Sequence, residues 1–190
     1  MRKLKIIEHI SLDGVIQGLR RRRRFPLRRL DRALSDPRWP GRNARRAWRE
    51  CFDLLLGRRT YDAWSGFWPK APSSPMADRL NAARKFIATH RPESLEWGPF
   101  QGLGPEIVEG IRRIKSHDGP DLILSGSSTL TSTLLEHGLP DEVLLAVYPV
   151  LLGTGKRFFA EGPRHAHSSS SVRKQCRPAS FSVLARSPTL

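Results

Sequence analysis

Two short segments combine the residue types that bind phosphate groups. The first is LLLGRRT (54–60), in which an apolar run ends at a glycine followed by two arginines and a threonine. An arginine can hold a phosphate through two parallel hydrogen bonds, and the first turn of a helix offers unpaired N–H groups. The second is LILSGSSTL (122–130), whose small residues let an anion approach the backbone closely. Both segments predict anion sites, although solvated arginines and an ordinary helix cap would leave the same patterns.

A third segment, SLDG (11–14), places an acidic side chain after the first apolar run. The Asp13 carboxylate can accept hydrogen bonds from a substrate amide or amine, and an aspartate that serves only its own turn fits the pattern equally well. Elsewhere the sequence shows no Ser-His-Asp arrangement, no paired carboxylates and no metal-ligand spacing. Of the six histidines, only His165 and His167 show a ligand-like spacing. We therefore expect no metal site and no nucleophilic triad.

Strands that alternate with helices must position these segments. Apolar, strand-like runs occupy 4–10, 52–57, 85–90, 121–126 and 141–153, with a short extended piece at 15–17. Helical patterns occupy 58–68, 76–83, 104–117 and 127–138, and a further helix is expected at 43–52. Apolar strands separated by helices indicate an α/β domain with a mainly parallel sheet covered on both faces. Both candidate anion segments then follow the carboxyl ends of strands, where such sheets bind ligands.

The basic residues are concentrated in two blocks. The net charge is +15, and positions 18–49 hold thirteen arginines against two aspartates, with five arginines in succession at 20–24. Positions 163–190 hold five basic residues and no acidic ones, so the remainder is close to neutral. Such blocks attract nucleic-acid phosphates, which makes nucleic-acid binding through 18–49 the alternative function. The block shows no helical stripe and no regular aromatic spacing, which disfavours a specific nucleic-acid site.

The length of 190 residues suits one domain of ordinary size. Cys51 and Cys176 form neither a disulfide framework nor a metal spacing, which favours a reducing compartment. No stretch approaches the ~20 apolar residues of a membrane span, and the N-terminal apolar run is too short for a signal peptide. We expect a cytoplasmic protein with one domain at 1–162 and a basic, poorly ordered tail at 163–190.

Five segments, in this order and spacing, resemble the dihydrofolate reductase-like family. They are ISLDGVI, FDLLLGRRTYD, KFIATH, LILSGSSTL and DEVLLAVYPVLLGTGKRFF. Within that family the resemblance is to the RibD C-terminal-domain branch, the riboflavin-pathway reductase domain and its stand-alone relatives, and it covers 4–17 and 51–161. It implies a three-layer α/β fold with a mixed, mostly parallel central sheet flanked by helices. It also implies a homodimer that reduces a small heterocyclic substrate with NADPH, such as 5-amino-6-(5-phosphoribosylamino)uracil.

The resemblance also implies which residues meet the cofactor. They are Gly57, Arg58, Thr60, Thr89, Arg91, Ser125, Gly126, Ser127, Ser128 and Thr129, with His90 beside them. The first loop is implied to hold the adenosine side, with Arg58 on the 2′-phosphate, and the small-residue loop is implied to lie under the pyrophosphate. Asp13 falls on the substrate side. Because a nicotinamide cofactor supplies the reactive atom in hydride transfer, the lack of a nucleophilic triad or metal ligands is consistent with this activity.

Two blocks depart from the family pattern. The arginine block at 18–50 stands where the family has a loop rich in Gly, Asp and Pro followed by a helix, and the tail at 163–190 stands where it has an apolar strand. CGN arginine codons read one base later encode Gly, Asp, Ala or Val. We therefore hypothesise that both blocks are frame-shifted stretches of a GC-rich gene, and resequencing that finds no family-like peptide in the other frames would refute this. Because these blocks correspond to the substrate flap and the closing strands, an exposed sheet edge and an inactive relative that keeps the fold are further expectations.

Overall fold

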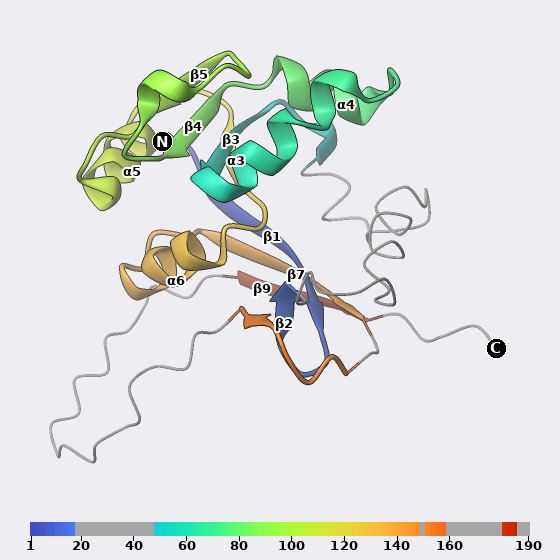
Figure 1. Cartoon of the computed structure of the whole chain (residues 1–190). Coiled ribbons are helices and arrows are strands. Elements are labelled where there is room, and N and C mark those ends of the chain that lie inside the picture. The colour runs from blue at the N-terminus through green and yellow to red at the C-terminus, as the bar shows by residue number, and fades with distance from the viewer. Residues whose placement is uncertain (18–47, 149–150, 159–179, 186–190) are drawn as a thin grey trace, which may run out of the picture.

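The computed structural model of the chain describes residues 1–17, 48–148, 151–158 and 180–185. Its centre is a seven-stranded sheet in the order β5-β4-β3-β6-β1-β7-β9, in which neighbouring strands are parallel (Figure 1). These strands are β1 (Leu4–Ser11), β3 (Phe52–Gly57), β4 (Lys85–Ala88), β5 (Phe100–Gly102), β6 (Asp121–Leu124), β7 (Glu142–Tyr148) and β9 (Ser180–Ala185). A separate antiparallel pair joins β2 (Val15–Gln17) to β8 (Lys156–Arg157).

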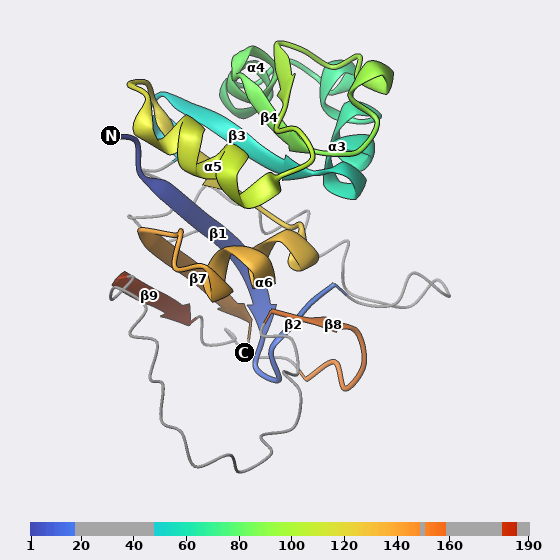
Figure 2. The same ribbon diagram turned by 90° about the vertical axis from the view of Figure 1, so that its left-hand side faces the viewer.

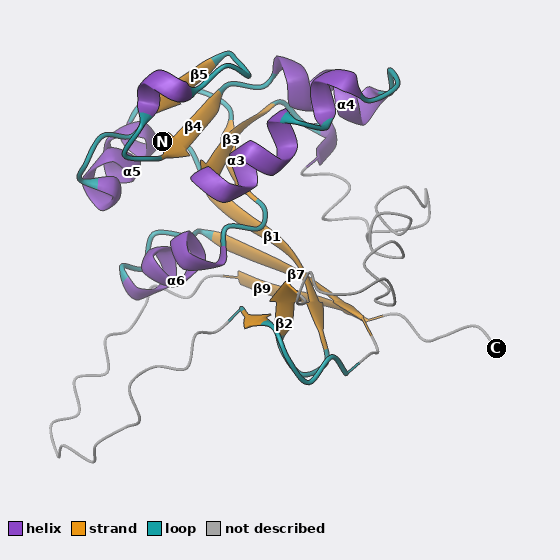
Figure 3. Ribbon diagram, viewed as in Figure 1, coloured by secondary structure: helices purple, strands orange, loops and turns teal. Residues whose placement is uncertain are grey.

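Helices cover both faces of the sheet and alternate with the strands along the chain (Figure 3). They are α3 (Arg58–Ser65), α4 (Pro75–Ala82), α5 (Ile107–Ser116) and α6 (Ser128–Glu136), with short 3₁₀ turns at Trp68–Lys70 and Pro92–Ser94. In Figure 2, α5 and α6 lie in front of the sheet. None of the helices in the described part of the chain is long and apolar enough to cross a membrane.

Alternate residues of β1 pack into different layers. All eight residues of this strand are buried. Ile6 belongs to a core cluster that contains Leu134 of α6 and Ile111 of α5, whereas Ile7 belongs to a second cluster that contains Leu80 of α4. A strand buried on both faces is mainly apolar on both, which explains why LKIIEHI shows no regular polar–apolar alternation, although its Lys5, Glu8 and His9 are buried as well. The central strands therefore separate two hydrophobic cores, which gives the three-layer domain.

The register of the strands brings the ends of β3, β4 and β6 to one edge of the sheet. Leu55 of β3 pairs with Leu124, the last residue of β6, and Gly57 pairs with Ala88, the last residue of β4. The polypeptide therefore leaves β3 and β4 at the same level, and it leaves β6 two residues earlier along the sheet. On β1, Ile6 pairs with Leu124, so β1 continues beyond the end of β6. The loops that follow β3, β4 and β6 consequently meet above the carboxyl edge of the sheet.

The structure confirms the predicted α/β class and the mostly parallel sheet, and it corrects three details. β5 has no counterpart among the predicted strands, and the strand predicted at 141–153 ends at Tyr148. The tail at 163–190 is predicted to be poorly ordered and to leave the sheet without its closing strand, and the structure corrects this at Ser180–Ala185, where β9 pairs with β7 and becomes the last strand of the sheet. The short stretch SFSVLA supplies the backbone N–H and C=O groups that β7 needs as partners. Most of the arginine block and residues 43–47 of the helix predicted at 43–52 lie outside the described residues; within 48–52 only Trp48 and Arg49 are helical, and Phe52 already begins β3.

Candidate functional site

A cleft of about 1020 Å³ opens at the carboxyl edge of the sheet. Its walls come from the starts of α3 and α6, from the end of β4 and from β8. The described residues that line it include Gly57, Arg58, Arg59, Thr60, Asp62, Thr89, His90, Gly126, Ser127, Ser128, Thr129 and Lys156. Most of the residues assigned to the cofactor from the sequence therefore share one cavity, although they come from three separate loops.

One serine joins the two main walls of the cleft. The Ser127 hydroxyl accepts a hydrogen bond from the Gly57 N–H at 2.9 Å and donates one to Thr60 Oγ1 at 2.9 Å. A Cβ atom on Gly57 would lie 3.1 Å from Ser127 Oγ, which is tighter than an ordinary contact. Any larger residue at 57 would therefore push against the second loop. The bridge sets the spacing between the α3 and α6 walls.

The loop before α6 turns through two left-handed residues. Gly126 has φ +69° and Ser127 has φ +60°, a conformation that non-glycine residues rarely adopt. Because the Ser127 hydroxyl is directed at Gly57 and Thr60, it does not cap α6, which it precedes. The first N–H groups of α6 are therefore left without the side-chain cap that a serine at this position usually provides. Together with the positive end of the helix dipole, they form a surface suited to an anion.

A buried carboxyl group supports this turn from behind. Glu8 extends past the end of β6, and its Oε2 accepts the Gly126 N–H at 2.7 Å. Burial raises the pKa of Glu8 to about 7 against the two backbone hydrogen bonds that lower it. Neither Glu8 nor its interaction with Gly126 was predicted from the sequence. The signal that could have identified it is an acidic residue inside the otherwise apolar run LKIIEHI.

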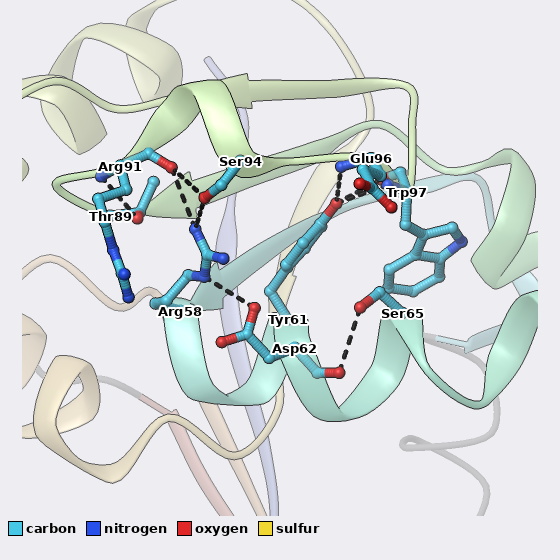
Figure 4. Close-up of polar contacts among 9 residues, drawn as sticks. All are labelled: Arg58, Tyr61, Asp62, Ser65, Thr89, Arg91, Ser94, Glu96 and Trp97. Atoms are coloured by element: carbon cyan, nitrogen blue, oxygen red, sulfur yellow. Dashed lines mark hydrogen bonds and ion pairs between the residues drawn. The ribbon is translucent and has the colours of Figure 1, made fainter.

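Arg58 fixes the outer wall of the cleft (Figure 4). Its Nε donates to Asp62 Oδ1 at 2.7 Å, and one terminal nitrogen donates to the Arg91 carbonyl at 3.0 Å and to Ser94 Oγ at 2.6 Å. One turn further along α3, the Tyr61 hydroxyl accepts the Trp97 N–H at 2.6 Å. The segment after β4 is thus held against α3. Among the described residues, no hydrogen bond engages the second terminal nitrogen of Arg58, and the neighbouring Arg59 is exposed.

Three predicted site residues lie beside the cleft or away from it. Arg91 and Ser125 flank lining residues and are not themselves in the lining. Asp13 accepts hydrogen bonds from Ser11 Oγ at 2.6 Å, the Leu152 N–H at 3.1 Å and the Gly153 N–H at 2.7 Å, and these bonds lower its pKa to about 2. Asp13 therefore braces the turn after β7, and its contact with a substrate stays a prediction.

A histidine and a tyrosine pair at the ends of β1 and β7. The distance from His9 Nδ1 to the Tyr148 hydroxyl is 2.8 Å, and burial lowers the pKa of His9 to about 4. The imidazole is therefore neutral at physiological pH.

Within the part of the chain that the structure describes, no group of three or more potential ligand side chains could hold a metal ion. The chemistry of the cleft is that of an anion site with several polar walls.

Solved structures with the same fold include enzymes of two related kinds. A putative riboflavin biosynthesis protein from Shewanella sp. PV-4 superimposes with a TM-score of 0.56 and 17% identity, over 84% of each chain. Dihydrofolate reductase from Enterococcus faecalis, complexed with NADP(H), gives a TM-score of 0.50 and 16% identity, over 84% of this chain and 77% of that one. A bifunctional diaminohydroxyphosphoribosylaminopyrimidine deaminase and 5-amino-6-(5-phosphoribosylamino)uracil reductase from Thermotoga maritima gives 0.51 and 19%, over 83% of this chain and 48% of that one. The chain thus has the fold shared by these three proteins.

Sequence comparison gives a more specific relationship. A curated relative, the uncharacterized protein YyaP of Bacillus subtilis (strain 168), is 27% identical over 112 residues, which cover 57% of this chain. The match spans 59% of that relative's length. The family model described as the RibD C-terminal domain matches residues 2–184, nearly the whole chain. The chain therefore belongs to the RibD C-terminal domain family.

Proposed function

We propose that the protein is an NADPH-dependent reductase that binds its cofactor in this cleft. The observation that carries the proposal is the pair of loops joined by Ser127, with the uncapped start of α6 on one side and the cationic start of α3 on the other. NADPH presents a pyrophosphate and a 2′-phosphate at the two ends of its adenosine ribose, and this arrangement offers donors for both. Among the described residues that line the cleft, Arg58, Arg59 and Lys156 outnumber the one acidic residue, Asp62.

The residues present fit such a dinucleotide. A Cβ atom on Gly126 would lie 3.2 Å from Thr60 Oγ1, so the glycine lets the α6 loop lie close to Thr60. The missing side chain also leaves the backbone at Gly126 accessible to a phosphate group. The N–H groups of Ser128 and Thr129 can donate to the pyrophosphate, and the exposed guanidinium of Arg59 and the remaining nitrogen of Arg58 can donate to the 2′-phosphate. When bound, the cofactor supplies a hydride. The protein's share is to bind, to orient and to keep the reacting face dry.

For the substrate, we propose a small heterocycle, with 5-amino-6-(5-phosphoribosylamino)uracil as the first candidate. Family membership supports this candidate, as does the likeness to the Thermotoga maritima protein whose name includes that reductase activity. That protein also carries a deaminase activity, and this chain covers 48% of it, so only the reductase part is carried over. The segment expected to cover the substrate, 18–50, lies almost wholly outside the described residues.

Cofactor binding by the purified protein tests the proposal. A ligand that binds only the folded chain raises its melting temperature, by an amount equivalent to about 2.7 kcal/mol at a hundredfold excess over Kd. We expect NADPH to raise the melting temperature, and Arg58→Ala to weaken that effect more than Arg113→Ala, a matched change of an exposed arginine on α5. The absence of any shift at millimolar NADPH would overturn the proposal. A shift without turnover of the uracil substrate would identify a relative that keeps the cofactor site and has lost this activity.

A further inference from the structure

The carboxyl group of Glu8 occupies an unusual place behind the wall of the cleft. Glu8 is 5% exposed, lies on the central strand β1 and is not part of the cleft lining. Both of its oxygens accept backbone N–H groups: Oε2 from Gly126 at 2.7 Å and Oε1 from His9 at 3.1 Å. A buried acid in an apolar strand is unfavourable unless its hydrogen bonds are made. The Gly126 contact is the long-range one, and it reaches the loop that begins the α6 wall.

The turn that Glu8 contacts is also the one that most needs support. Gly126 and Ser127 both adopt left-handed backbone conformations, and for serine this conformation is disfavoured. From this conformation the Ser127 hydroxyl reaches Gly57 and Thr60 across the cleft. The turn is therefore held at two points, from behind by Glu8 and from in front by the Ser127 bridge. Releasing either point lets the start of α6 move relative to α3.

We propose that Glu8 is a positioning residue of the cleft, whose carboxyl group holds the Gly126 N–H and thereby fixes the left-handed turn that presents the α6 amides to an anionic ligand. The identity of that ligand as NADPH rests on the proposed function. The geometry of the turn does not depend on it.

The charge of Glu8 links this support to pH. An ionised carboxylate directly behind Gly126 repels an anion bound in front of it, and a neutral carboxyl group does not. On β6, β7 and α6 the charged residues are Asp121, Glu142 and Glu136, and all three lie at the ends of these elements away from Glu8. Helix α5, which packs in the same core cluster as β1, carries four: Glu109 pairs with Arg112, Lys115 pairs with Asp141, and Arg113 is exposed. The pKa of Glu8 is raised to about 7 by burial, with no charged side chain among its causes, and the adjacent His9 is neutral. Binding of an anion should therefore favour the protonated form of Glu8 within an accessible pH range.

The first test follows the Gly126 amide in the free protein by ¹⁵N-edited NMR between pH 5 and pH 9. In the unsubstituted protein, we expect the Gly126 amide proton to shift with a midpoint near pH 7. Glu8→Gln should abolish this titration, and Glu136→Gln, the same change at an exposed position on α6, should leave it intact. A Gly126 amide that does not titrate, or that titrates equally in Glu8→Gln, would overturn the proposal. If Glu8→Gln does not fold, the pH titration of the Gly126 amide in the unsubstituted protein still tests the proposal.

The second test measures the Kd for NADPH at pH 6 and pH 8 in the same three proteins. If the bound state excludes ionised Glu8, the Kd of the unsubstituted protein rises about tenfold over this interval relative to that of Glu8→Gln. The 2′-phosphate of NADPH also titrates, and this contribution cancels in the ratio. At pH 6 we expect Glu8→Gln to bind about fivefold more weakly, because a glutamine side chain offers one acceptor oxygen to two N–H groups. Equal pH dependence in both proteins would overturn the proposal, whereas no NADPH binding by any of them would overturn the proposed function and leave the NMR test to decide the role of Glu8.

Discussion

Replacing Ser127 by alanine and by glycine should separate the two roles of this residue. Alanine removes the hydroxyl, so the Gly57 N–H loses its acceptor and Thr60 loses its donor, while the left-handed backbone conformation at 127 persists. A part-buried donor without a partner costs about 1–3 kcal/mol, so we expect Ser127→Ala to lower the free energy of unfolding by about 2 kcal/mol. Glycine loses the same bridge and relieves a left-handed strain of about 1–2 kcal/mol, so Ser127→Gly should lose only about 1 kcal/mol.

Urea denaturation of the three proteins measures these differences from the transition midpoints at constant m-value. Ser132→Ala is the matched control, because the Ser132 hydroxyl bonds only to the Ser128 carbonyl within α6, and we expect it to change stability by less than about 0.5 kcal/mol. A double-mutant cycle of Ser127→Ala and Thr60→Val should show that the two losses of stability are not additive, since the two side chains share one hydrogen bond. The reasoning fails if Ser127→Ala costs no more than the control, or if Ser127→Gly is less stable than Ser127→Ala.

Four further outcomes are expected. The pKa of the Glu8 carboxyl group is raised from 4.5 to about 7, so its contribution to stability is complete below pH 4.5 and is lost as the pH rises to 7. In urea titrations between pH 4.5 and pH 8, the free energy of unfolding of the unsubstituted protein should therefore fall by up to about 3 kcal/mol relative to that of Glu8→Gln. Gly126→Ala adds a methyl group 3.2 Å from Thr60 Oγ1 at a positive φ, and should lower stability by about 2 kcal/mol, measured the same way. Arg58→Ala should weaken NADPH binding more than NADH binding in fluorescence titrations, because only NADPH carries the 2′-phosphate; equal losses would place that phosphate elsewhere. Deletion of 18–49 should remove most of any salt-dependent DNA affinity in a filter-binding assay, and unchanged affinity would end the nucleic-acid alternative.

Homodimer formation is a prediction of the family resemblance alone. Sedimentation of the purified chain measures it directly. The frame-shift hypothesis also stays a prediction, because both blocks fall mainly outside the described residues. The exception is Ser180–Ala185, where β9 pairs with β7 despite its place in the serine-rich and basic tail. At least this part of the tail therefore supplies a strand to the sheet.

Local pattern was sufficient for most of the fold. Apolar runs bounded by Gly or small residues predicted β1, β3, β4 and β6, and the 3–4-residue apolar spacing of 104–117 predicted α5. The same reasoning missed β5, because FQG is too short and too polar to stand out. It overextended β7, because the apolar run continues to Leu151 and Leu152, which do not belong to the strand. In each case the strand boundary depends on a backbone partner that is distant in sequence.

Some residues of the candidate site could be identified from the sequence, and the roles of others became clear only in the structure. Gly57, Arg58 and the SGSST segment could be identified as candidate anion sites from local type and spacing, because each follows a strand and begins a helix, and the family resemblance implied the cofactor. Asp13 could not be placed, because its role depends on the Leu152 and Gly153 amides, which meet it across the ends of β1 and β7. The resemblance implies that Arg58 contacts the 2′-phosphate, and the fold also gives it Asp62, Ser94 and the Arg91 carbonyl as partners.

The sequence by itself determined the α/β class, the positions of the strand-to-helix turns and the residue types available at them. Those features depend on periodicity, glycine and small side chains, all of which act over a few residues. Only the tertiary structure decided which groups meet: the Ser127 hydroxyl reaches Gly57 from 70 positions away, and the Glu8 carboxyl group reaches Gly126 from 118 positions away. A hydrogen bond needs its donor and acceptor about 3 Å apart, and that proximity arises from strand order and register, which no local pattern encodes.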